Sequence, residues 1–105
     1  MAKKASQEPT NAADLERDLE LLEADMKRLE AEYNMFFAGR LPRPPWETRG
    51  RVTAMVRRLD NIHIANTGMR FRFTTLQSRH QTFSDLWDRG LKAKEEGRPG
   101  PFANL

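Results

Sequence analysis

The sequence predicts an all-α protein, a three-helix up-down-up bundle with coiled-coil-like packing. Three observations predict it: apolar residues recur four and three positions apart, prolines and glycines interrupt the pattern, and an acidic stretch precedes a basic one. A chain of 105 residues fits one domain. We expect residues 11–97 to form the bundle, between a disordered N-terminal tail (1–10) and a flexible C-terminal tail (98–105).

The first helix has the strongest pattern. Its apolar stripe alternates four and three residues apart and comprises Leu15, Leu19, Leu22, Met26, Leu29, Tyr33 and Phe36. Asn11 can act as N-cap by accepting a bond from an unpaired amide, whereas Gly39 and Pro42 stop the pattern. These signals predict a helix from Ala12 to Phe37.

A proline-rich loop follows, because Pro42, Pro44 and Pro45 lack amide donors and push the preceding residues toward extended geometry. Proline is favoured as a first helical residue. The stripe then resumes at Val52, Met55, Leu59 and Ile62. We therefore expect a second helix from about Pro45 to Ala65.

The apolar rhythm continues without a phase slip through Asn66-Thr67-Gly68, a tripeptide that disfavours a helix interior. A chain reversal there is favoured, because an antiparallel first helix would already have run out at this point. The third helix is expected from about Met69 to Glu96. The alternative is a dimeric helical hairpin with one very long second helix. The alternation in 69–73 also fits a strand, but it is short and has no hairpin partner.

The charges are distributed unevenly along the chain. Residues 11–37 carry eight acidic and three basic residues, a net charge of −5, whereas residues 38–80 carry two acidic and nine basic residues, a net charge of +7. The flanks of the first stripe are all acidic: Glu16, Asp18, Glu23, Asp25, Glu30 and Glu32. The flanks of the later stripes are basic: Arg51, Arg58, Arg70, Arg72 and Arg79.

Like charges beside the stripe oppose self-pairing of the first helix, so the complementary charges predict pairing within one chain. If the proline loop is a symmetric turn, Glu32 approaches Arg51. By the same symmetry, Asp25 approaches Arg58. Such exposed pairs select topology and register more than they stabilise the fold.

No catalytic, metal or cofactor site is expected, and the protein is not predicted to be an enzyme. Cysteine is absent, and His63 and His80 have no second ligand at helical metal-site spacing. His80 lies on the third stripe and is interpreted as a hydrogen-bonded core histidine. No run of about eighteen apolar residues occurs, so no membrane span is expected. Because cysteine is absent, an oxidising compartment is not indicated, and the location is predicted to be cytoplasmic.

The function that these features favour is a non-enzymatic adaptor or assembly module that binds another protein or a second copy of itself. The candidate partner-binding residues, chosen because arginine and large aromatics recur at binding hot spots, are Arg40, Arg43, Trp46, Phe71 and Trp87. Residues 42–45 also match a minimal proline-recognition pattern, which a loop explains equally well. In the tail, Phe102 and Leu105 either dock on the bundle or form a short docking peptide.

The alternative function is nucleic-acid binding through the Arg-rich central region. Arginines interspersed with aromatics suit phosphates and stacked bases. The acidic helix in the same small domain would weaken their field, so this alternative is less favoured. The arginines that the acidic helix should leave free are Arg40, Arg43, Arg49 and Arg57.

Overall fold

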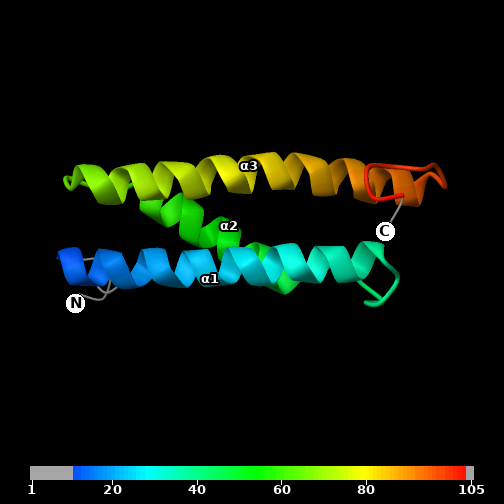
Figure 1. The fold of residues 1–105 in the computed structure, drawn as a ribbon, viewed down its shortest axis with the longest axis horizontal. Helices are drawn as coiled ribbons and strands as arrows, with labels where there is room; N and C mark the ends of the chain where they lie inside the picture. The colour runs from blue at the N-terminus through cyan, green and yellow to red at the C-terminus, as the bar shows by residue number, and fades with distance from the viewer. Residues whose placement is uncertain (1–10, 104–105) are drawn as a thin grey trace.

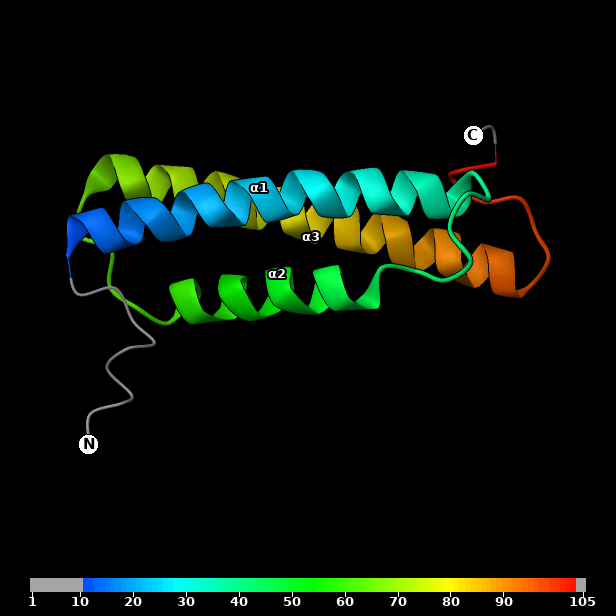
Figure 2. The same cartoon turned by 90° about the horizontal axis from the view of Figure 1, so that it is seen from below.

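The computed structural model describes residues 11–103, which form three helices: α1 (Ala12–Phe37), α2 (Trp46–Asp60) and α3 (Thr67–Glu95) (Figure 1). No strand occurs among these residues. α1 packs against both other helices, α2 runs back antiparallel to it, and α3 runs parallel to it (Figure 2). The up-down-up bundle is confirmed, and the very long second helix is not formed. The expected N-terminal tail lies outside the described residues.

α1 begins and ends at the predicted residues. The side-chain oxygen of Asn11 accepts a hydrogen bond from the amide of Asp14 at 2.9 Å, so Asn11 is the N-cap. Beyond the helix, Gly39 adopts a φ of +84°, a conformation that glycine reaches without strain. All seven residues of the predicted stripe are buried.

α2 is shorter than predicted, because it ends at Asp60 and not near Ala65. The side-chain amide of Asn61 donates to the carbonyl of Arg57 at 3.0 Å, which satisfies a carbonyl at the helix end. The chain then leaves the helix and buries Ile64, which is only 5% exposed. Ile64 lies off the predicted stripe, so a continued helix would have kept it from the core.

The reversal therefore occurs over residues 61–66, earlier than the expected Asn66-Thr67-Gly68. Asn66 is the N-cap of α3, because its side chain accepts from the amide of Met69 at 2.9 Å. The unbroken apolar spacing across this region is a coincidence, because residues 61–66 are not helical and the spacing has no geometric meaning there. The 69–73 segment is helical, as the long-range periodicity predicted.

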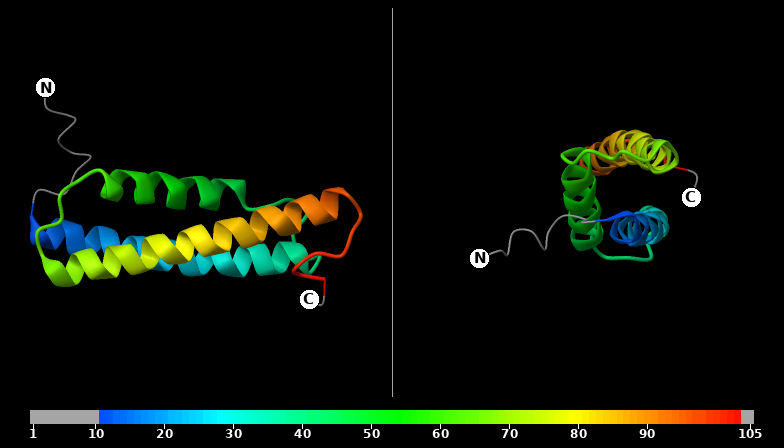
Figure 3. Two further views of the ribbon diagram at one scale, coloured as in Figure 1. Left: turned by 90° about the horizontal axis from the view of Figure 1, so that it is seen from above. Right: turned by 90° about the vertical axis from the view of Figure 1, so that its left-hand side faces the viewer.

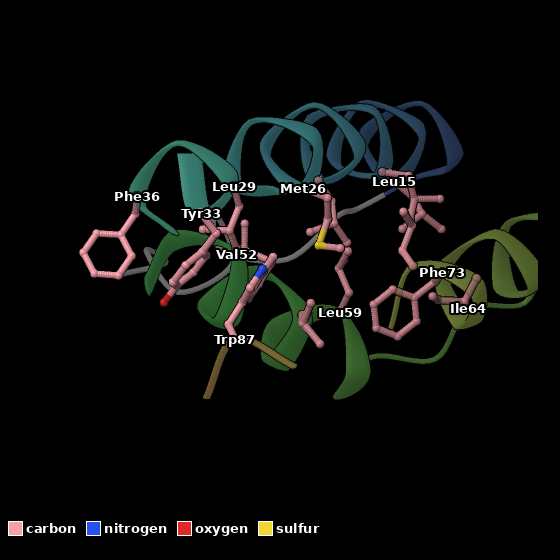
Figure 4. Close-up of a cluster of buried hydrophobic side chains, with 14 residues drawn as sticks. Leu15, Met26, Leu29, Tyr33, Phe36, Val52, Leu59, Ile64, Phe73 and Trp87 are labelled. Carbon is pink, nitrogen blue, oxygen red and sulfur yellow. The ribbon is translucent and has the colours of Figure 1, made fainter. Parts of the chain in front are cut away.

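The core lies along the axis of the bundle, where the α1 stripe meets apolar side chains of α2 and α3 (Figure 4). Val52 and Leu59 pack from α2, and Phe73 and Trp87 pack from α3. The Trp87 ring stacks on Tyr33 with ring centroids 4.3 Å apart.

Residues 98–103 fold back onto the bundle instead of extending from it as a tail. Gly97, with a φ of +69°, turns the chain after α3. Phe102 then stacks on Phe37 of α1 with ring centroids 4.1 Å apart. Both rings pass directly over Gly90, where a Cβ would lie 2.8 Å from each. Docking of Phe102 on the bundle is confirmed, whereas Leu105 lies outside the described residues.

The described part of the chain is elongated, with extents of 49 × 30 × 18 Å. Figure 3 shows α2 on one side of the α1–α3 pair, whose other side carries no helix. None of the three helices combines the length and the apolar character that a bilayer span requires.

Candidate protein-binding surface

The two acidic flanks of α1 face different helices, and along each flank the paired residues recur every seven positions. One flank contacts α2: Asp18 lies 3.1 Å from Arg58, and Asp25 lies 3.8 Å from Arg51. Complementary pairing within the chain is therefore confirmed. The two predicted pairs are wrong by one heptad, because each arginine contacts the acidic residue seven positions earlier than expected.

The proline loop explains this shift. Residues 41–45 do not make a symmetric turn but run back along α1 beside Arg28 and Glu32. As a result, α2 begins next to the middle of the last third of α1 and not next to its C-terminal end. Glu32 accepts instead from Arg28 of its own helix at 3.0 Å. Burial raises the pKa of the Glu32 carboxyl, but the hydroxyl of Thr48 and the Arg28 guanidinium outweigh it and hold the pKa below its ordinary value.

The other acidic flank contacts α3. Arg72 bonds two carboxylates one heptad apart, Glu23 at 2.9 and 3.1 Å and Glu16 at 3.2 Å. Arg79 bonds Glu30 with both a 2.6 Å and a 2.8 Å contact. The bond with Glu23 lowers the pKa of that carboxyl and raises the pKa of Arg72. These contacts hold α1 and α3 in parallel register.

Two arginines differ from the prediction: Arg70 of the expected basic flank is exposed and makes no ion pair with another described residue, and Arg49 is not left free. The Arg49 guanidinium bonds the hydroxyl of Tyr33 at 2.9 Å and the carboxylate of Asp88 at 2.9 Å. It also lies 5.7 Å from the ring centre of Tyr33 and 5.8 Å from that of Trp87. A buried tyrosine hydroxyl requires a hydrogen-bond partner. The position of Tyr33 on the predicted apolar stripe therefore indicated that some polar residue, here Arg49, would be drawn into the bundle.

The five candidate partner-binding residues do not form one surface. Trp87 is only 1% exposed and its ring stacks on Tyr33, so it belongs to the core and the prediction that it lies on a binding surface is wrong. Trp46 is 57% exposed and lines, with Arg43, a hollow of about 450 Å³ between the proline loop and α1. Arg40 is exposed in the same loop. Phe71 lies near the start of α3, toward the opposite end of the molecule.

Phe71 stands beside a groove of about 640 Å³ that is lined only by α1 and α3, which we call the α1/α3 groove. The buried side chains of Met26 and Leu76 form its floor. Lys27 of α1 and the small residues Gly68 and Thr75 of α3 form its walls. Sequence reasoning selected Phe71 but not the groove, because its depth depends on how the two helices pack.

The described residues contain no group of three or more histidine or acidic side chains placed to hold a metal ion. His80 is half-buried, and its Nε2 lies 3.4 Å from the hydroxyl of Thr53. Burial, with a smaller effect from Arg49, lowers the pKa of His80. This arrangement is that of a core histidine with a polar neighbour.

The fold and surface define the class of protein as a three-helix bundle with an open apolar groove. No family model matches the chain, and no curated protein or solved structure matches it.

Proposed function

We propose that the protein is a non-enzymatic helical adaptor or assembly module that binds another protein through the α1/α3 groove. One observation carries the proposal: Phe71 is 72% exposed at the edge of an apolar hollow. Large exposed aromatics beside concave apolar surfaces are typical of binding sites and are costly to leave in water. Phe71 is accordingly the anchor, and Met26 and Leu76 provide the apolar floor.

Phe71 faces outward from α3, because it lies two positions before the core residue Phe73 on the same helix. Arg72 is held by carboxylates of α1, and Phe73 is 4% exposed in the core. Phe71 takes part in none of the ring stacks among the described residues. Aromatic packing within the bundle therefore gives no reason for a phenylalanine at this position.

The state of the arginines favours protein binding over nucleic-acid binding. Arg51, Arg58, Arg72 and Arg79 all bond carboxylates of α1, and Arg49 bonds Asp88. Neutralised arginines release few counterions from a phosphate backbone, so they contribute little to nucleic-acid affinity.

Site-specific photo-crosslinking in the native cell tests the proposal. A benzophenone amino acid at position 71 should give a discrete adduct with another protein, and Thr75→Arg, which fills the groove, should abolish that adduct. The same probe at Leu21, 50% exposed on the outer face of α1, is the matched control and should give none. Adducts at position 46 with none at position 71 would place the binding surface at the proline loop and contradict the groove.

A further inference from the structure

Resting on the proposed function, we infer that the occupant of the α1/α3 groove is a single amphipathic helix from another protein. This helix packs beside α1 and α3 as a fourth helix and places an acidic side chain against Lys27. Three features of the groove carry the inference: its direction, its walls and the exposed cation of Lys27, which makes no ion pair within the described residues and has only a minor electrostatic effect on Glu23.

The direction of the groove suits a helix. Glu23–Arg72 and Glu30–Arg79 both join residues 49 positions apart, so α1 and α3 keep one parallel register along the groove. Helical backbones have satisfied hydrogen bonds, and the described residues offer no strand edge, so an extended peptide has no ladder to join. Recognition must therefore use side-chain faces, as a helix in a groove does.

The walls admit a helix at close range. Gly68 and Thr75 stand seven residues apart on α3, about 10 Å along the helix, and both are small. Phe71 lies between them in the chain and can cover an approaching helix from the rim. On the floor, Met26 and Leu76 can receive apolar side chains spaced three or four residues apart.

The charge of the groove selects an acidic partner and disfavours a second copy. Arg72 and Arg79 are already bonded to carboxylates of α1. Lys27 is exposed and makes no ion pair with any residue from 11 to 103. In a two-fold dimer centred on the groove, Lys27 would face Lys27 of the other copy and repel it.

Selection from a displayed library of random 18-residue peptides, with the full chain as bait, tests this inference. Peptides selected on the wild type should show apolar residues at helical spacing, flanked by Asp or Glu. Selection on Lys27→Glu should change the flanking preference to Lys or Arg. Thr75→Arg should weaken binding of the wild-type peptides by at least roughly tenfold.

Thr74→Arg is the matched control, because Thr74 is exposed on α3 but does not line the groove. It should leave peptide binding unchanged. Equal thermal melts of the Thr74 and Thr75 variants establish that both are folded.

Selected peptides without helical apolar spacing, or an acidic preference that survives Lys27→Glu, would overturn the inference. A concentration-dependent dimer in analytical ultracentrifugation that Thr75→Arg dissolves would instead assign the groove to a second copy. If adducts at position 71 persist while the peptides fail, only the helical occupant is wrong. If the adducts are also absent, the proposed function falls with it.

Discussion

The guanidinium of Arg49 donates a hydrogen bond to the hydroxyl of Tyr33 at 2.9 Å, inside the bundle. Tyr33 is fully buried on α1, Arg49 comes from α2, and the guanidinium also bonds Asp88 of α3. One arginine thus joins all three helices. Burial raises the pKa of Tyr33, whereas for Arg49 the opposing effect of burial is outweighed by the bonds to Tyr33 and Asp88, and the pKa is raised.

Arg49→Met should lower the free energy of unfolding by about 1–3 kcal/mol, because it leaves the Tyr33 hydroxyl buried without a partner. In a Tyr33→Phe background the same substitution should cost less, since no hydroxyl remains to be orphaned. Urea denaturation followed by circular dichroism measures both. Arg57→Met, on the exposed face of α2, should change the stability by less than about 0.5 kcal/mol.

The register of α1 against α2 can be tested by charge reversal at low salt. Arg58→Glu should destabilise the fold by about 0.2–1 kcal/mol, and adding Asp18→Arg should restore much of the loss, because the pair is re-formed with opposite sign. Adding Asp25→Arg instead should restore nothing, since Asp25 faces Arg51. Thermal melts compare the two double variants. If stability recovered in the Asp25→Arg double variant and not in the Asp18→Arg one, the symmetric turn would be supported.

Gly90→Ala should destabilise the protein by about 1–3 kcal/mol, because its Cβ would lie 2.8 Å from the rings of Phe37 and Phe102. Gly50→Ala is the matched control within α2, where a Cβ meets nothing within 4 Å. It should stabilise the helix by about 0.5–1 kcal/mol. Equal effects of the two substitutions in urea titrations would show that the ring stack over α3 does not form.

His80 should make the fold sensitive to mild acid. Its pKa is lowered in the folded state, so the unfolded chain binds the proton first, at about pH 6.5. Stability should therefore be constant above that pH and fall as the pH drops from about 6.5 toward the lower folded value. His80→Gln should flatten the curve between pH 7.5 and 5. A wild-type curve that coincides in shape with the variant's would contradict this assignment.

Nucleic-acid binding should be too weak to measure below tens of micromolar at near-physiological salt. Fluorescence anisotropy with generic DNA and RNA, at several salt concentrations, measures it. The exposed Arg40 and Arg43 are the residues to replace, since neither makes an ion pair with another described residue. A sub-micromolar, salt-sensitive complex that is lost on Arg40→Ala and Arg43→Ala would replace the adaptor proposal.

The sequence by itself determined the helical class, the up-down-up order and the limits of α1. Local interactions are sufficient for these. A heptad stripe such as Leu15 to Phe36 must be buried, and Asn11 starts the helix and Gly39 stops it whatever the helix packs against. The opposite charges of α1 and the later helices likewise predicted pairing within the chain, because like charges exclude self-pairing.

Only the tertiary structure decided the register, the end of α2 and the location of the groove. Each depends on contacts between residues far apart in the chain. The loop at 41–45 moves α2 by one heptad by lying beside Glu32, and Ile64 ends α2 early by entering the core. Trp87 is buried because Tyr33 and Arg49 meet it, whereas Phe71 stays exposed beside a groove that only α1 and α3 line.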